Sequence, residues 1–153
     1  MNNYFFDSSA LVKRYVTEAG SGWVSSLINP TTGNHIFIMR IAAVEVVSAI
    51  VRRQRAGNLS VSDMSASLTR FRSELATIYL PVEVSQNLVS NAMALAESHA
   101  LRGYDAVQLT AALEVYSEHR LAGLTLPTFI SADAALNTAA VAEGLSVDNP
   151  NVH

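Results

Sequence analysis

Two aspartates stand directly after short apolar runs, where a strand would give way to a helix. Asp7 follows the aromatic run Tyr4–Phe6, and two residues separate Asp133 from the run Phe129–Ile130. If both runs are strands of a parallel sheet, their carboxyl ends lie at one edge, which is where such sheets bind ligands. The spacing therefore brings two carboxylates to a candidate site.

Two further acids fall near predicted helix starts. Glu45 lies within the apolar segment 41–47, and its neighbours on the helix face bring no cation. An unpaired glutamate on a buried helix is costly, so Glu45 needs a partner from elsewhere. That partner is either a cation shared with other acids or a distant arginine. Asp105 begins the helix that follows the break at Gly103.

The donor types in this set select a class of metal. The chain has no cysteine, and its four histidines show no metal-ligand spacing. A carboxylate cluster of this kind suits hard, oxygen-preferring cations, Mg²⁺ or Mn²⁺ rather than Zn²⁺. If the four acids converge, mutual repulsion should raise the pKa of at least one of them.

Each aspartate also has a purely structural explanation. Asp7 and Asp133 are well placed to cap the helices that follow them, and Asp105 is a first-turn acid favoured by the helix dipole. The residue pattern alone leaves both interpretations open.

The composition favours one soluble domain spanning residues 1–153. Half of the 153 residues are hydrophobic and 15% are charged, which is enough for a substantial core. The first twenty residues carry four charged side chains and no apolar run approaches the length of a membrane span. We therefore expect a cytoplasmic protein without a membrane segment.

The charge pattern gives a mixed indication about nucleic acids. The net charge of −3 is not that of a typical nucleic-acid-binding protein. Nine of the ten cations are arginines, however, and arginine suits phosphate. The densest basic cluster is Arg52, Arg53 and Arg55, which either contacts RNA or simply complements the dipole at a helix end.

Strand-like and helix-like segments alternate along the chain. Strands are predicted at 3–6, 35–39, 77–82, 126–131 and 145–147, with Pro81 indicating a strand end or a sheet edge. Helices are predicted at 10–15, 23–28, 41–55, 60–75, 85–101, 104–121 and 134–143, the third of them largely buried. This alternation predicts an α/β fold with three layers, α/β/α, around a mostly parallel sheet of four to five short strands.

Several other chemistries are excluded by missing motifs. The chain lacks the glycine-rich phosphate loop, the dinucleotide-binding glycine pattern and the nucleophile elbow. A phospho-aspartate phosphatase needs a second aspartate two positions after Asp7, where Ser9 stands.

Four segments together resemble the PIN-domain nucleases, most closely the VapC toxins of bacterial type II toxin–antitoxin pairs. They lie in the order and spacing of that family and span most of the chain. They are Tyr4-Phe5-Phe6-Asp7-Ser8-Ser9-Ala10-Leu11-Val12-Lys13-Arg14-Tyr15, Ala43-Val44-Glu45-Val46-Val47-Ser48-Ala49, Leu101-Arg102-Gly103-Tyr104-Asp105-Ala106-Val107-Gln108-Leu109 and Phe129-Ile130-Ser131-Ala132-Asp133-Ala134-Ala135-Leu136-Asn137.

The resemblance implies a PIN-like fold and a Mg²⁺-dependent ribonuclease. Asp7 and Asp105 are then the central metal ligands, and Glu45 and Asp133 complete the shell. Ser9 either holds a ligand carboxylate or the scissile phosphate, or caps the first helix. The resemblance also implies two protein partners, a small cognate antitoxin and a second copy of the chain.

Two other functions fit the same residues. One is a PIN-like interaction module that has lost catalysis, although the four intact acids speak against it. The other is a divalent-metal phosphatase that acts on small phosphoesters. Metal-dependent cleavage of RNA distinguishes the nuclease from both.

Overall fold

The computed structural model describes residues 1–153 and contains one five-stranded sheet. Its strands are β1 (Asn3–Phe6), β2 (His35–Met39), β3 (Tyr79–Val82), β4 (Thr128–Ile130) and β5 (Ser146–Asp148). The α-helices are α1 (Ser8–Leu11), α2 (Ser21–Leu27), α3 (Ala42–Arg55), α4 (Val61–Thr77), α5 (Gln86–His99), α6 (Gly103–Leu121) and α7 (Ala134–Ala142). Short 3₁₀ turns follow at Val12–Arg14, Pro30–Thr32 and Pro150–Val152.

All strand pairs are parallel, and the strand order is β3-β2-β1-β4-β5. The predicted α/β class and strand number are therefore confirmed. Pro81 lies in β3, which is an edge strand, as its missing backbone N–H requires.

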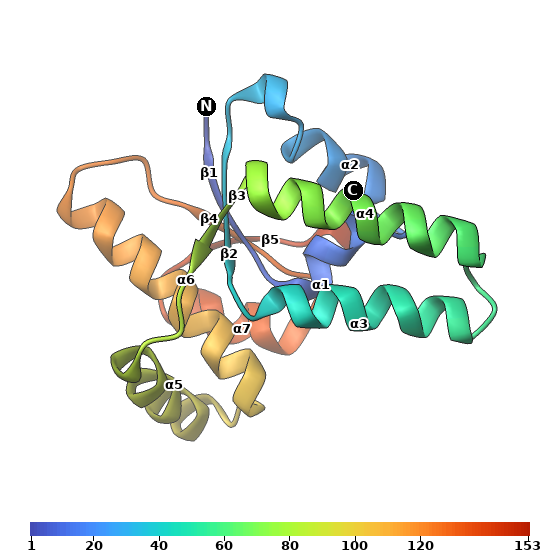
Figure 1. Ribbon diagram of the computed structural model, residues 1–153. Helices are drawn as coiled ribbons and strands as arrows, with labels where there is room; N and C mark the ends of the chain where they lie inside the picture. Colours follow the sequence, from blue (N-terminus) through green and yellow to red (C-terminus); the bar gives the residue numbers. More distant parts are fainter.

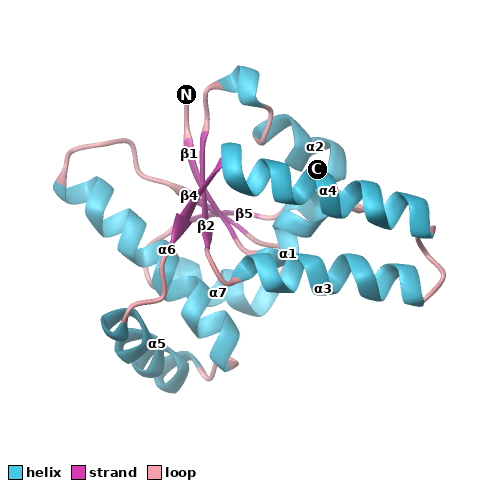
Figure 2. Cartoon of the chain, viewed as in Figure 1, coloured by secondary structure: helices cyan, strands magenta, loops and turns pink.

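Alternating strand side chains create two cores, one on each face of the sheet. Phe6 and Ile38 pack with residues of α1 to α4, whereas Phe5 and Phe129 pack with residues of α5 to α7. The two groups of helices cover opposite faces (Figures 1 and 2). The period of two along a strand thus produces the predicted three layers.

The order in which successive strands are added to the sheet reverses at β1. The chain moves outward from β1 to β2 and β3, then crosses back to place β4 on the other side of β1. Ligands of open α/β sheets bind outside the carboxyl ends of the strands at such a switch point. Asp7 follows β1, and Ser131 and Asp133 follow β4, so the switch point is also the acidic edge.

Two predictions about helices need correction. The predicted helix 10–15 is α1 with a 3₁₀ turn after it. The predicted burial of residues 41–55 is wrong, because only Ala42, Val46 and Ile50 of α3 are buried while Val44 is 67% exposed. The apolar residues of this helix exceed what one buried face can hold. No helix is both long and apolar enough to cross a bilayer.

Candidate active site

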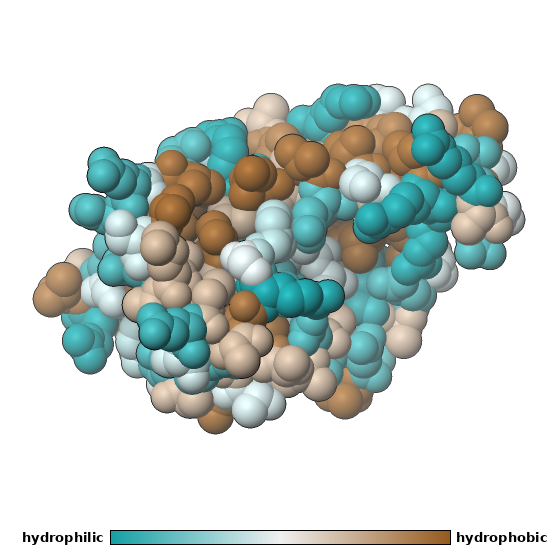
Figure 3. All heavy atoms as spheres, turned by 90° about the horizontal axis from the view of Figure 1, so that it is seen from below, coloured by the Kyte–Doolittle hydropathy of each residue, from teal (hydrophilic) through white to brown (hydrophobic).

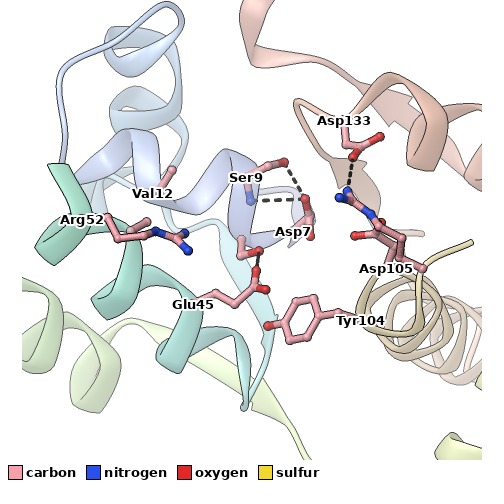
Figure 4. Close-up of a pocket in the computed structure, with 11 residues that line it drawn as sticks. Asp7, Ser9, Val12, Glu45, Arg52, Tyr104, Asp105 and Asp133 are labelled. Atoms are coloured by element: carbon pink, nitrogen blue, oxygen red, sulfur yellow. Dashed lines mark hydrogen bonds and ion pairs between the residues drawn. The ribbon is translucent and has the colours of Figure 1, made fainter. Parts of the chain in front are cut away.

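The four predicted acids line a single pocket of about 340 Å³. They come from four places in the chain: the turn after β1, the first turn of α3, the first turn of α6 and the turn before α7. The other residues around the pocket are Ser8, Ser9, Val12, Ala49, Arg52, Arg102 and Tyr104. Figure 4 shows Asp7, Glu45, Asp105 and Asp133 arranged around a common space.

Asp7 is held by three hydrogen bonds to one of its carboxylate oxygens. The Ser9 hydroxyl donates to Oδ2 at 2.5 Å, the Ser9 backbone N–H at 3.2 Å, and the Ser131 hydroxyl at 3.2 Å. Ser9 Oγ also accepts a hydrogen bond from the Ala132 backbone N–H at 3.0 Å. Because all three donors engage Oδ2, the other oxygen, Oδ1, is left for a ligand in the pocket.

Asp7 therefore caps a helix and lines the pocket at the same time. Asp7 caps α1 through Ser9, and Asp133 caps α7 by accepting from the Leu136 N–H at 3.0 Å. Of the interpretations left open for Ser9, the contact with a carboxylate of the pocket is present, since its hydroxyl donates to Asp7. The capping role predicted for Ser9 is wrong, because Asp7 occupies the N-cap position of α1. Backbone capping fixes these side chains in position.

Burial raises the pKa of the Asp7 carboxyl, and hydrogen bonds from Ser9 and Ser131 offset part of this rise. The charge of Asp105 adds a smaller upward contribution. Crowding of acids was expected to raise a pKa in this cluster, and the direction is confirmed. The main cause is different, because Asp7 is only 3% exposed and desolvation dominates.

Glu45 finds its partner on α1 rather than in an arginine. The Ser8 hydroxyl donates to Glu45 Oε2 at 2.5 Å, across 37 positions of the sequence. This hydrogen bond ties α3 to α1 and leaves Oε1 for a water molecule or a cation. The distant arginine, one of the two partners expected for Glu45, is replaced by a hydroxyl that no charge pattern could indicate. The other expected partner, a cation shared with the neighbouring acids, stays a prediction.

Asp105 and Asp133 share one cation, the guanidinium of Arg102. Its Nε lies 3.0 Å from Asp105 Oδ2, and its terminal nitrogen lies 3.4 Å from Asp133 Oδ2. The Arg102 side chain is 80% exposed, whereas the two carboxylates are 19% and 28% exposed. An exposed arginine thus neutralises one side of the pocket.

Tyr104 projects into the same space between Glu45 and Asp105 (Figure 4). Burial raises the pKa of its hydroxyl, and the carboxylates of Glu45, Asp7 and Asp105 raise it further. The phenol therefore stays protonated and can donate a hydrogen bond at neutral pH.

The predicted arginine cluster divides among different surroundings. Arg52 lines the pocket with the acids. Arg53 instead pairs with Glu18, which also binds Lys13 at 3.2 Å. Arg55 is exposed at the end of α3 and does not line the pocket. Only Arg52 of the three is therefore placed to meet a ligand of the acidic site.

The donor set suits a hard divalent cation in kind and in location. Carboxylates and hydroxyls surround the pocket, and no sulfur or histidine ligand lines it. In the present arrangement no three acids lie close enough to hold one ion together. Arg102 supplies the positive charge between Asp105 and Asp133. The carboxylate and hydroxyl oxygens of the pocket are of the kind that Mg²⁺ and Mn²⁺ prefer.

Comparison with known proteins decides the family. The chain is 34% identical over 143 residues to Ribonuclease VapC45 and to Ribonuclease VapC49, each from Mycobacterium tuberculosis strains. The match covers 94% of this chain and 92% of each relative. The chain belongs to the VapC ribonuclease family. The family resemblance inferred from the four acidic segments is thereby confirmed.

Solved structures agree with the fold of a VapC protein. The chain matches VapBC2 from Rickettsia felis, solved with a promoter DNA fragment, with a TM-score of 0.61 at 13% identity over 96% of this chain and 98% of that one. It matches PAE2754 from Pyrobaculum aerophilum with a TM-score of 0.62 at 16% identity over 99% and 85%. At these identities the likeness concerns the PIN-domain fold alone. No protein-family model matches the chain.

Four residues of this VapC-family site had no role assigned from the sequence. They are Ser8, Arg102, Tyr104 and Ser131, all within the segments that carry the family resemblance. Their positions next to or close to Asp7, Asp105 and Asp133 in the sequence could have indicated that they belong to the site. Which carboxylate each one contacts depends on the tertiary fold.

Proposed function

We propose that this chain is a Mg²⁺-dependent endoribonuclease that hydrolyses RNA phosphodiesters, and that Mn²⁺ can replace Mg²⁺. The single observation that carries the proposal is the convergence of Asp7, Glu45, Asp105 and Asp133 on one pocket at the switch point of the sheet. Membership of the VapC ribonuclease family supports the choice of RNA as the substrate.

Asp7 and Asp105 are the proposed central ligands, and Glu45 and Asp133 complete the shell directly or through water. A bound Mg²⁺ would lower the pKa of a coordinated water and offset charge on the phosphate. The protein's own contribution is positioning: Ser9 and Ser131 fix Asp7, and Ser8 fixes Glu45.

Glu45 is the residue best placed to orient the attacking water. Its Oε2 is engaged by Ser8, so Oε1 can accept a hydrogen bond from that water. Arg52 lies on the same helix as Glu45, lines the same pocket and can pair with a phosphate oxygen. Hydrolysis then joins the water oxygen to phosphorus, breaks one P–O ester bond, and delivers the proton to the leaving oxygen.

The proposal extends to two protein partners. A small cognate antitoxin would bind the chain and cover the acidic pocket, and a second copy would form a homodimer. Exposed hydrophobic residues support protein contacts, since Val44, Met93 and Leu121 are 67%, 69% and 86% exposed. Figure 3 shows hydrophobic side chains gathered in a band on one face.

The test is cleavage of labelled single-stranded RNA by the purified chain. Activity should need Mg²⁺ or Mn²⁺, disappear in EDTA and return when metal is added back. Asp105→Asn protein from the same purification excludes a contaminating nuclease. Full cleavage in EDTA would contradict the metal requirement, and hydrolysis of p-nitrophenyl phosphate without RNA cleavage would favour the phosphatase.

A further inference from the structure

Arg102 occupies an unusual place among the charged residues of the pocket. It precedes Gly103 at the N-cap position of α6, and its own backbone brings the side chain to the pocket rim. Its guanidinium reaches the first turn of α6 at Asp105 and the turn before α7 at Asp133. One flexible side chain thus links two acids of separate elements.

The oxygens that Arg102 engages are donors of the proposed metal shell. Nε binds Asp105 Oδ2 at 3.0 Å, and the terminal nitrogen approaches Asp133 Oδ2 at 3.4 Å. A carboxylate oxygen that accepts a guanidinium hydrogen bond has lost the lone pair directed at that donor, and the guanidinium fills the space in front of it. Arginine and metal therefore compete for the same side of the pocket.

The exposure values indicate that this contact can be displaced. Arg102 is 80% exposed and stays solvated when it leaves, so its release costs little. The carboxylates are much less exposed, and without Arg102 they would face Glu45 and Asp7 with no cation paired to them. Mutual repulsion among those acids raises the free energy of the protein when no cation is paired with them.

We propose that Arg102 is a built-in counter-ion that competes with the divalent cation for Asp105 and Asp133. The inference rests on the proposed function, because it assumes that the acids bind a metal. In the metal-free protein Arg102 neutralises the pair, and metal binding displaces it. Its presence weakens the affinity for the divalent cation and prevents ions of low affinity from binding to the acids.

Arg52 supplies a matched control for general electrostatics. It is an exposed arginine that lines the same pocket and forms no ion pair with a carboxylate. Arg52→Gln removes one positive charge from the pocket without freeing any acid. Arg102→Gln removes the same charge and also frees Asp105 and Asp133.

The experiment is calorimetric titration of Mn²⁺ into metal-free wild type, Arg102→Gln and Arg52→Gln proteins in 150 mM salt. Arg102→Gln should bind Mn²⁺ more tightly by roughly three- to tenfold, the size expected for loss of exposed ion pairs. Arg52→Gln should change the dissociation constant less than about twofold, because salt screens its charge. Equal tightening in both variants, or none in Arg102→Gln, would overturn the competition.

A second measurement follows Arg102 itself. In the wild type the Nε–H resonance of Arg102, assigned by its loss in Arg102→Gln, should shift and exchange faster with water as Mg²⁺ is added. The Arg14 Nε–H, bonded to Glu74 far from the pocket lining, should not move and serves as the internal reference. An Arg102 signal unchanged at saturating Mg²⁺ would show that the arginine stays in place and overturn the inference.

The two proposals fail in different ways. If no variant binds Mn²⁺ or Mg²⁺, the proposed metal-dependent function fails, and the competition fails with it. If the wild type binds metal and Arg102→Gln binds it equally well, only the competition is wrong.

Discussion

The carboxylate of Glu74 and the four carboxylates of the pocket meet opposite surroundings. Glu74 on α4 accepts hydrogen bonds from Arg14 at 2.9 and 3.2 Å, from the Tyr15 hydroxyl at 2.6 Å and from Arg70 at 3.0 Å. Its side chain is only 12% exposed, and that of Arg14 is 8% exposed. Every acceptor oxygen of this glutamate is engaged by the protein.

The acids of the pocket have fewer hydrogen-bond donors and counter-ions from the protein. Asp105 and Asp133 share one exposed arginine. Asp7 and Glu45 accept hydrogen bonds from serines, and each keeps one oxygen free of protein donors. A closed network of charges stabilises the fold, whereas an open set of carboxylates can bind something else. The comparison predicts that mutations in the two groups separate activity from stability.

The largest expected effect is on activity, at Asp7. Asp7→Asn removes a central negative charge from the proposed metal site, and RNA cleavage should fall by a factor on the order of 10² or more. Stability should stay the same or rise, because a buried charge is replaced by a neutral group of the same shape. Initial cleavage rates and urea unfolding of the same preparation measure both quantities.

Asp148→Asn is the control for Asp7. Asp148 ends β5 at the same edge of the sheet but does not line the pocket. Its replacement should leave the cleavage rate close to that of the wild type. Equal losses at Asp7 and Asp148 would mean that a carboxylate at this edge matters only for the fold.

The second prediction is that a substitution at Glu74 lowers stability and leaves activity unchanged, the opposite of the result expected at Asp7. Glu74→Gln leaves the buried Arg14 guanidinium without its counter-ion, which should cost about 3 kcal/mol of unfolding free energy. Cleavage per folded molecule should not change, since Glu74 is absent from the pocket lining. The urea midpoint is the measurement, with Glu83→Gln as control, because Glu83 and Arg40 form an exposed pair whose side chains are 68% and 52% exposed. A midpoint no lower than that of Glu83→Gln would show that the network contributes nothing.

The third prediction concerns pH. Burial alone would raise the pKa of Glu74, but hydrogen bonds from Arg14, Tyr15 and Arg70 outweigh it and leave the pKa lowered from 4.5. A lowered folded-state pKa gives stability that is present above pH 4.5 and is lost as the pH falls through the folded value. Urea unfolding between pH 6 and pH 3 should therefore show a steeper acid decline for the wild type than for Glu74→Gln. Parallel curves would contradict the assignment.

The elements of the fold were predictable because their signals are local. The strands at 3–6 and 35–39 have the predicted bounds, since short runs of apolar and aromatic side chains favour strands. The exposure of Val44 was not predictable, because apolar residues around all sides of α3 do not say which side meets the core.

The convergence of the four acids was predictable from their order and from their places after strands or near helix starts, but their hydrogen-bond partners were not. Ser8 meets Glu45 across 37 positions, and Ser131 meets Asp7 across 124. Hydroxyl contacts of this range depend on how strands and helices pack, and serines carry no periodic signal. Arg102 stands three positions before Asp105 in the sequence, yet its reach to Asp133 follows from the position of β4 beside β1.

The smallest expected effect separates the three arginines at the end of α3. Arg52 lines the acidic pocket, Arg53 pairs with Glu18, and Arg55 is exposed away from the pocket. If Arg52 contacts a phosphate of bound RNA, Arg52→Gln should raise KM several-fold with little change in kcat, because it removes binding shared by substrate and transition state. Arg55→Gln should leave both constants unchanged.

The salt dependence of RNA binding tests the phosphate contact directly, using the Asp105→Asn background so that the RNA stays intact. Loss of one phosphate contact should reduce the slope of log K against log salt by about 0.7 for single-stranded RNA. Arg53→Gln should alter the unfolding midpoint and not this slope, since its charge is already committed to Glu18. Equal slopes for Arg52→Gln and Arg55→Gln would mean that RNA binds along the end of the helix as a general basic surface, and that Arg52 has no special place at the acidic pocket.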